Sequence, residues 1–336
     1  MKKVLFIADV RNWAYDDRAK HWRSLLKKDY KIDLLYLSDY KGVSPTHKFY
    51  RLLKEYQSAA ESYGSSNLSD LISEKNLFSI KGVDVRPIFN HKDYDIIYFF
   101  YHRALCDVRL MATPIPLEKV IIGINNEKWT ETCAEKEYEI YMKGVAGLSV
   151  CNAFIEESFF GLNENIFRVS QCVDKRVFFK TKDKRNNKRF TVGWSGNYNN
   201  PLKNFNIIKT SCQRSRVNFA YTKDLSRDQL NLWYNTLDCV VCASKSEGGP
   251  MMILEAGAAS VPVISTDVGL VREILVDKKN GLKVSPDVKS ISRAIKLLSS
   301  NKSLRSDLGR NLNKEIISNW TYESKVDEIR NLLNIF

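Results

Sequence analysis

The chain has 336 residues, 44% of them apolar, and a formal net charge of +13 at pH 7. This length and apolar content predict a soluble, globular protein of two ordinary domains. No run approaches the roughly 18 consecutive apolar residues that a transmembrane helix needs, so a membrane-spanning protein is excluded.

Cysteine usage indicates the compartment. The seven cysteines are odd in number and scattered, which argues against a secreted disulfide framework and for a reducing environment. We therefore expect a cytoplasmic protein. Cys239 and Cys242 form a C-x-x-C pair, but they lie within a buried-strand pattern and lack a second ligand pair. No metal site is expected there or elsewhere.

Short apolar runs alternate with amphipathic stretches along the whole chain, a pattern typical of parallel sheets with crossover helices. In the first part of the chain we predict five strands: Val4–Ala8, Ile32–Leu37, Ile96–Phe100, Val120–Ile124 and Gly147–Cys151. These strands predict a first domain over residues 1–179.

A charged stretch without apolar residues, 180–189, is predicted to be an interdomain linker. The second domain is predicted over residues 190–320. Its expected strands are Thr191–Ser195, Val217–Tyr221, Leu237–Ala243 and Val261–Ser265. We expect the amphipathic tail, residues 321–336, to pack back across the linker onto the first domain.

Two glutamates, Glu247 and Glu255, stand either side of seven residues at a predicted strand-to-helix junction. Gly248 and Gly249 end the strand, and Pro250 suits the first helical position because its missing N–H would be unpaired there. The free amides that follow, from Met251 to Ile253, form a tip that attracts phosphate. A carboxylate at 255 can accept two ribose hydroxyls, and one at 247 can reach sugar hydroxyls beyond the phosphates. A nucleotide-sugar spans both.

This segment, with Pro262–Gly269 after it, resembles the signature of family 4 retaining glycosyltransferases. The resemblance implies the GT-B fold: two doubly wound, Rossmann-like domains facing a cleft, with the acceptor on the first domain and the donor on the second. It implies no cofactor beyond the nucleotide-sugar co-substrate. It also implies that Glu247 positions the donor sugar rather than attacking it.

Charge on the departing diphosphate must be stabilised, and a cation or fixed amides can do so without metal. Lys203 is the candidate cation. It follows Gly196 and Asn197, a turn that resembles the family's first donor-domain turn. The family has an arginine where this chain has Asn197, which donates hydrogen bonds but brings no charge.

Candidates in the first domain are less specific. The family places a histidine after the strand at Val120–Ile124, where this chain has Asn125, and His102 is an alternative cleft residue. The loop after the first strand lacks the G-x-G-x-x-G of dinucleotide-binding units, so a nicotinamide dehydrogenase is not expected. Because ligands bind at the carboxyl ends of strands in open α/β sheets, this loop provides further acceptor-site candidates. They are Asp9, Arg11, Asn12 and Trp13.

Residues 1–54 hold 13 Lys and Arg against 6 Asp and Glu. Many of these cations lie on one predicted helix, at Arg18, Lys20, Arg23, Lys27 and Lys28, and we expect them to point outward. Such a surface favours an anionic partner.

Three functions therefore stay open. The first is sugar transfer in surface-glycan assembly, with a lipid-linked acceptor at the inner membrane face. The second is glycosylation of a hydroxymethylated base in DNA, and the third is a catalytically silent module that binds nucleotide-sugar or glycan. The oligomeric state is not indicated.

Overall fold

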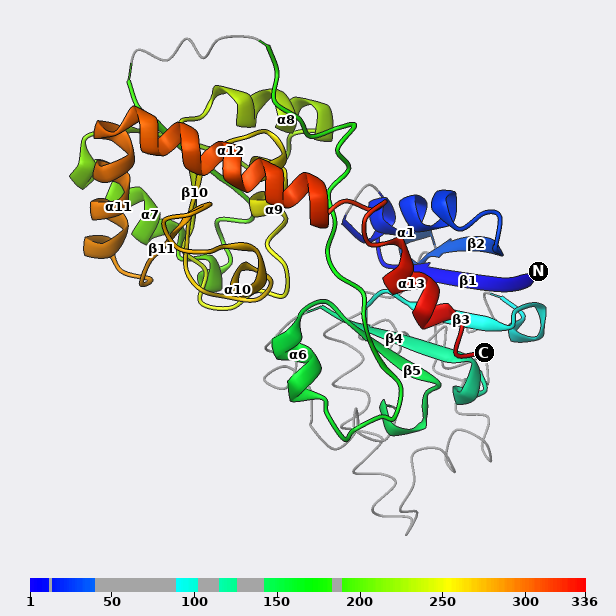
Figure 1. The fold of residues 1–336 in the computed structure, drawn as a ribbon. Helices are drawn as coiled ribbons and strands as arrows, with labels where there is room; N and C mark the ends of the chain where they lie inside the picture. Colours follow the sequence, from blue (N-terminus) through cyan, green and yellow to red (C-terminus); the bar gives the residue numbers. More distant parts are fainter. Residues whose placement is uncertain (12–13, 40–88, 102–114, 126–141, 183–188) are drawn as a thin grey trace, which may run out of the picture.

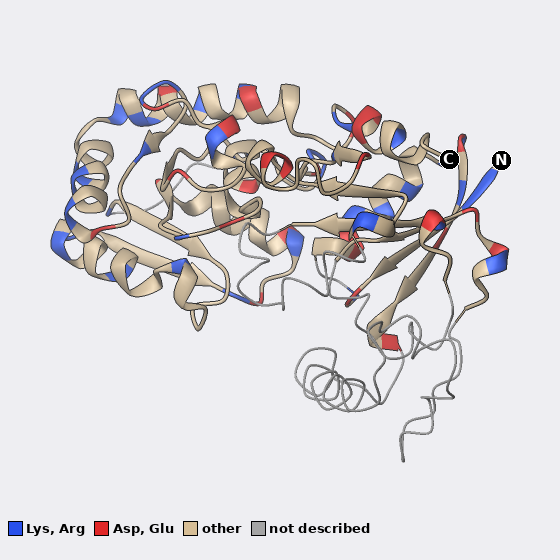
Figure 2. Ribbon diagram, turned by 90° about the horizontal axis from the view of Figure 1, so that it is seen from below, with Lys and Arg blue, Asp and Glu red and all other residues tan. Residues whose placement is uncertain are grey.

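The computed structural model describes residues 1–11, 14–39, 89–101, 115–125, 142–182 and 189–336. Two α/β domains lie next to each other and are joined by two passages of the chain (Figure 1). None of the helices in these ranges is long and apolar enough to cross a bilayer. Charged residues lie mainly on helices and loops (Figure 2).

The first sheet has six parallel strands in the order β2-β1-β3-β4-β5-β6. They are β1 (Lys2–Ala8), β2 (Tyr30–Tyr36), β3 (Ile96–Phe99), β4 (Val120–Ile124), β5 (Gly147–Val150) and β6 (Ile166–Arg168). Val4 and Phe6 of β1 join the core cluster that contains Trp22 of α1 (Ala14–Leu25), whereas Leu5 and Ile7 join the cluster on the other face. Burial of alternate residues on both faces explains the continuous apolar runs.

The second sheet has five parallel strands in the order β11-β10-β9-β7-β8. They are β7 (Thr191–Ser195), β8 (Asn218–Thr222), β9 (Cys239–Cys242), β10 (Val263–Ser265) and β11 (Leu282–Lys283). The helices of this domain are α7 (Phe205–Ser215), α8 (Arg227–Thr236), α9 (Met251–Ala258), α10 (Val271–Ile274), α11 (Val288–Ser300) and α12 (Lys302–Asn319). One core cluster contains buried residues of β7, β9, β10, β11 and these helices, and Phe219 and Ala220 of β8 pack against it.

The nine strands expected from the sequence are all present, with their ends shifted by at most two residues. β6 and β11 were not predicted, because three and two residues are too few to show a strand period. Cys239 and Cys242 are buried, unlinked thiols within β9. Residues 183–188 of the predicted linker lie outside the described ranges.

The chain passes between the domains twice. After β6 it runs into the second domain, and after α12 it returns beside that passage, where Val173 N–H donates to the carbonyl of Trp320 at 2.9 Å. α13 (Val326–Leu333) then lies against the first domain (Figure 1). Its residues Ile329, Leu332 and Leu333 are buried in the cluster that contains Trp22. The returning helix and the two doubly wound domains confirm the GT-B fold expected from the resemblance.

α1 corrects one expectation. Arg18 was expected to point outward with the other cations, but its side chain is 1% exposed. The reason is its spacing: Arg18 lies four residues before the buried Trp22, and residues four apart share a helix face. Lys20, Arg23 and the cations after the helix are exposed as expected.

Candidate active site

The loop after β9 is held in place by glycines. Gly269, at a φ of +49°, packs against the backbone carbonyls of Glu247 and Gly248, and Leu270 N–H donates to the Gly248 carbonyl at 3.0 Å. A Cβ on Gly248 would overlap the backbone carbonyl of Asn125 in the first domain. The two domains therefore touch at the tip of α9, where only glycine fits.

α9 begins at Met251, so Pro250 is the N-cap rather than the first helical residue. Ile253 N–H donates to the Pro250 carbonyl at 3.0 Å. The expected tip of free amides is therefore shorter than predicted, since one of the three N–H groups is used inside the first turn.

Lys203 and Glu247 meet directly. Lys203 Nζ donates to Glu247 Oε1 at 2.5 Å, and Ser244 Oγ donates to the same oxygen at 2.7 Å. Lys203 ends a short 3-10 turn, Pro201–Lys203, which the loop binds through the hydrogen bond from Lys245 N–H to the Leu202 carbonyl at 2.8 Å. This turn aims the lysine at the carboxylate and leaves its other N–H donors available.

Glu255 lies one helix turn beyond the tip, and its residue is 8% exposed. Tyr234 OH donates to Glu255 Oε2 at 2.8 Å, and the phenol in turn pairs with Ser195 Oγ at 2.8 Å. Burial raises the pKa of Glu255, and the Tyr234 hydrogen bond partly opposes that rise. Tyr234 therefore fixes one carboxylate oxygen, and the other remains available to a ligand.

These side chains line one cavity of about 430 Å³. Its volume lies within the usual range for small-molecule sites, roughly 300–1,000 Å³. The cavity contains Glu247, Glu255 and Lys203 together, and α1 of the first domain closes one side through Ala14. Of the other predicted donor-site residues, those lining it are Gly196, Gly249, Pro250 and Met251.

Asn197 and Gly248 do not line this cavity. Asn197 is exposed, and its side-chain oxygen accepts from the backbone N–H of Asn199 at 3.1 Å, so the side chain is used in its own turn. Gly248 faces the first domain instead.

On the first domain, burial raises the pKa of Asp9. Arg11 pairs with Asp39 at 2.8 Å, away from the cavity. The remaining candidates, Asn12, Trp13 and His102, lie outside the described residues.

Asn125 lies where the first domain meets the loop. Its side-chain oxygen accepts from Arg18 Nη1 at 2.9 Å and from Gln171 Nε2 at 3.3 Å, and its amide nitrogen donates to the Phe100 carbonyl at 2.9 Å. Asn152, after β5, donates to the Gly248 carbonyl at 2.7 Å. The first domain thus contacts the loop before α9 through the backbone of Asn125 and the side-chain amide of Asn152.

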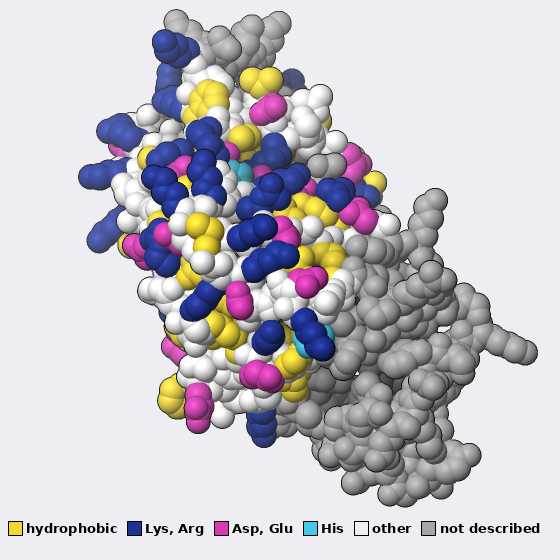
Figure 3. All heavy atoms as spheres, turned by 90° about the vertical axis from the view of Figure 1, so that its right-hand side faces the viewer, with side chains coloured by type: hydrophobic (Ala, Val, Ile, Leu, Met, Phe, Trp, Pro, Cys, Tyr) yellow, Lys and Arg dark blue, Asp and Glu magenta, His cyan; other side chains and the backbone are white. Residues whose placement is uncertain are grey.

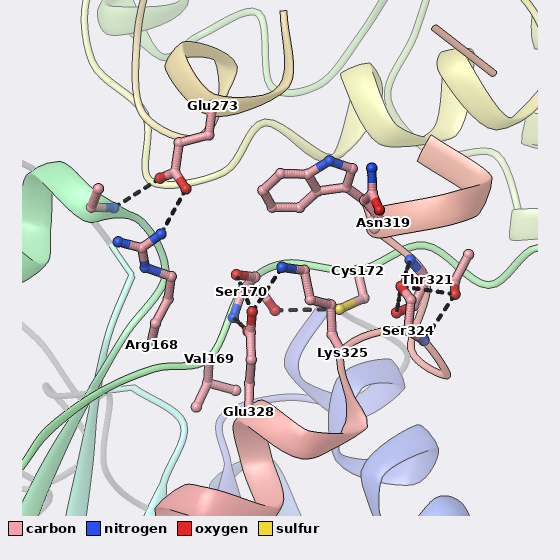
Figure 4. Close-up of polar contacts among 12 residues, drawn as sticks. Arg168, Val169, Ser170, Cys172, Glu273, Asn319, Thr321, Ser324, Lys325 and Glu328 are labelled. Atoms are coloured by element: carbon pink, nitrogen blue, oxygen red, sulfur yellow. Dashed lines mark hydrogen bonds and ion pairs between the residues drawn. The ribbon is translucent and has the colours of Figure 1, made fainter. Parts of the chain in front are cut away.

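A second contact joins the domains through α10, as Figure 4 shows. Glu273 Oε1 accepts from the backbone N–H of Ala153 at 2.8 Å, at the start of α6 (Ala153–Ser158), and Oε2 pairs with Arg168 Nη1 at 2.9 Å. On the same passage Ser170 N–H donates to Glu328 of α13 at 2.7 Å. Since α10 follows the Gly269 turn, this contact lies next to the loop that carries Glu247.

Residues 180–315 match the family model described as "Glycosyl transferases group 1". The match covers most of the second domain. The chain is 34% identical over 140 residues to an uncharacterized glycosyltransferase, MJ1178, of Methanocaldococcus jannaschii, covering 38% of this chain and 39% of the relative. It is 30% identical over 105 residues to the capsular polysaccharide biosynthesis glycosyltransferase CapM of Staphylococcus aureus, covering 31% and 28%. The chain thus spans less than two fifths of these curated relatives.

Among solved structures, Anabaena Alr3699/HepE in complex with UDP-glucose superposes with a TM-score of 0.70 at 12% identity, covering 100% of both chains. Identity this low supports the fold and nothing finer. The second domain is therefore similar in sequence to the glycosyl transferases group 1 model, and the whole chain is similar in fold to HepE.

Several residues of the site were not predicted. Tyr234 lies on a helix whose sequence gives no sign that it reaches Glu255. Asn152 could have been found, because it directly follows the expected strand Gly147–Cys151 and ligands bind at the carboxyl ends of strands. The partners of Arg18 could not, since Asn125 and Val169 lie far from it along the chain.

A basic groove runs along β2, the edge strand of the first sheet. We define it by five cations: Arg11, Lys20, Arg23, Lys27 and Lys31. Arg11 and Lys20 pair with Asp39 and Asp16, whereas the other three have no ion pair with the described residues. Lys and Arg side chains gather on the face of the molecule shown in Figure 3.

Proposed function

We propose that this protein is a retaining glycosyltransferase that moves a sugar from a nucleotide-sugar to a hydroxyl acceptor. The observation that supports it most is the cavity in which Lys203, Glu247 and Glu255 converge at the tip of α9. The ribose hydroxyls would donate to the free oxygen of Glu255, and the diphosphate would lie at the start of α9. The hydroxyls of the donor sugar would bind Glu247.

In the proposed reaction the acceptor oxygen bonds to the anomeric carbon on the face that the diphosphate leaves. The bond from that carbon to the phosphate oxygen breaks, and the departing oxygen takes the acceptor's proton. The charge that develops on the diphosphate is stabilised by Lys203 and by the amides at the start of α9. No Asp or Glu nucleophile and no cofactor is required, and we propose that the reaction is independent of metal.

We propose surface-glycan assembly as the pathway, since the chain is 30% identical over 105 residues to CapM, a glycosyltransferase of capsular polysaccharide biosynthesis. A lipid-linked acceptor would place the enzyme at an anionic membrane surface, and the basic groove suits such a surface. The same groove favours the second candidate, transfer to a hydroxymethylated base in DNA.

A panel of nucleotide-sugars tests the proposal. The purified protein should release nucleoside diphosphate from one donor without acceptor, and product mass spectrometry on lipid and DNA acceptors should identify the transfer. Anomeric configuration by NMR should match the donor. Turnover should survive EDTA, and abolition by EDTA with rescue by Mg²⁺ or Mn²⁺ would refute the metal-free mechanism. Binding of a donor without any release would identify a silent module instead.

A further inference from the structure

Among the described residues, Arg18 is a buried cation without an anionic partner. Its side chain is 1% exposed, its Nε has no hydrogen bond, and it forms no ion pair with the described residues. The neighbouring carboxylates are used elsewhere, since Asp16 pairs with Lys20 and Asp17 with Arg227. Burying a charge without a counter-charge is costly, and arginine keeps its charge in proteins, so this position requires an explanation.

The guanidinium is directed toward the domain contact. Nη1 donates to Asn125 Oδ1 at 2.9 Å, and Nη2 donates to the Val169 carbonyl. Because two donors cannot face each other, the Asn125 amide must keep its oxygen toward Arg18 and its nitrogen toward Phe100. Arg18 therefore fixes the orientation of Asn125.

The α9 tip begins on the other side of Asn125. The Asn125 backbone carbonyl packs against Gly248, and Gln171, which also donates to the Asn125 side chain, packs against Gly249. Ala14, one turn before Arg18 on the same face of α1, lines the donor cavity. A desolvated positive charge at this place is weakly screened, so an anion at the tip would experience it.

We propose that Arg18 is a positioning residue of the transfer site, which holds Asn125 against the α9 tip and directs a buried positive charge toward the departing diphosphate. This inference rests on the proposed function. Lys203 is one cation for the diphosphate. Asn197, on the second domain, brings no charge and lies outside the cavity, so a second cation, Arg18, would come from the first domain. Turnover would then require both domains, whereas nucleotide affinity would depend mainly on the second.

Three variants separate charge from packing. Arg18→Gln removes the charge and can still donate to Asn125, Arg18→Lys keeps the charge, and Asn125→Asp supplies a carboxylate that neutralises Arg18 without changing side-chain size. We expect kcat for donor hydrolysis to fall about tenfold to hundredfold in Arg18→Gln and Asn125→Asp and to stay within a few-fold in Arg18→Lys. The affinity for the nucleoside diphosphate should stay within about twofold in all three.

The matched control is Arg310→Gln, which replaces an exposed arginine of α12 that pairs with Asp307. This variant should keep full turnover. The melting temperature of each variant guards against misfolding, because Asn125→Asp gains an ion pair with Arg18 but loses the hydrogen bond to the Phe100 carbonyl. Full turnover in Asn125→Asp, or an equal loss in Arg18→Lys and Arg18→Gln, would overturn the role of the charge while leaving the proposed function intact. If the unmodified protein neither binds nor cleaves any nucleotide-sugar, the proposed function fails first and this inference with it.

Discussion

The two sides of the cleft are built from the sequence in different ways. On the second domain, the loop after β9 and the start of α9 supply Glu247 and Glu255 within one short segment, and a single turn adds Lys203. On the first domain, Arg18 and Asn125 are 107 residues apart, and Arg18 and Val169 are 151 apart. A site made from one segment is readable as a motif, whereas a site made from distant residues exists only once the chain has folded.

The comparison also separates two tasks. Donor binding would need mainly the second domain, because Lys203, Glu247 and Glu255 line one cavity and all belong to that domain. Transfer would need both domains, because the α9 tip is completed by Asn125 and Asn152. Variants on the two sides should therefore affect different steps.

The largest effect is expected at Lys203. Replacing it in Lys203→Ala removes the cation that would stabilise the diphosphate, so turnover should fall on the order of a hundredfold or more. Steady-state kinetics of donor hydrolysis measures this. The control is Lys245→Ala, which removes an exposed lysine side chain near the same loop. Its turnover should be near normal. Asn197→Arg should preserve or raise turnover. Full activity in Lys203→Ala would place the phosphate site elsewhere.

Glu255→Ala should weaken binding of the nucleoside diphosphate and of the whole donor alike. Loss of a hydrogen bond from ribose to this charged group costs roughly 1.5 to 3 kcal/mol. Calorimetry with the nucleoside diphosphate gives the number directly. Glu157→Ala removes an exposed carboxylate on α6 and should leave the affinity unchanged. A folded Glu255→Ala protein with normal affinity would contradict the ribose assignment.

Tyr234→Phe should change the pH dependence of that binding. Burial raises the pKa of Glu255 and the Tyr234 hydrogen bond lowers it, so losing the hydroxyl should raise the pKa further. In the proposed site the ribose would bind the ionised carboxylate, so affinity should fall as pH drops through this pKa. In Tyr234→Phe the fall should begin at a higher pH, with near-normal affinity in more alkaline buffer. Tyr221→Phe, at an exposed tyrosine, is the control. Superimposable pH profiles would exclude the effect.

The sequence predicted the sheets because their strands are buried on both faces and therefore read as apolar runs. It predicted that Glu247 and Glu255 lie close together, because they stand on one loop and the helix that follows it, where the number of residues between them sets the distance. Asn197 shows the limit of that reasoning. Its place in the chain suggested the donor site, but a local hydrogen bond to Asn199 holds its side chain in the turn instead.

Arg18 was misjudged for a different reason. Helical spacing put Arg18 on the face of the buried Trp22, but the polar groups that bind it there, Asn125 and the Val169 carbonyl, lie far along the chain. Local pattern cannot show a partner of that kind. Contacts between distant segments, which position Arg18, Asn152 and Glu273, are therefore the part of the site that only the folded structure provides.

The smallest effect, and one confined to the first domain, is expected in the basic groove. Because Arg18 is buried, the test uses the three groove cations without an ion pair to a described residue, as the triple variant Arg23→Gln, Lys27→Gln and Lys31→Gln. Donor hydrolysis should stay nearly intact, while binding to an anionic acceptor should weaken and its salt dependence become shallower, by up to about one unit of slope per lost contact with DNA.

Sedimentation with anionic vesicles and DNA gel shifts on the same protein distinguish the two candidate acceptors. The groove cations attract both a membrane and DNA, but only the true partner should bind at physiological salt. The matched control replaces three exposed cations of α11, Lys289, Arg293 and Lys296, with Gln. It changes the net charge equally on the other domain, so an equal loss in both triple variants would indicate a general charge effect. If the unmodified protein binds neither vesicles nor DNA, the groove cations serve solvation, and a small soluble glycan becomes the favoured acceptor.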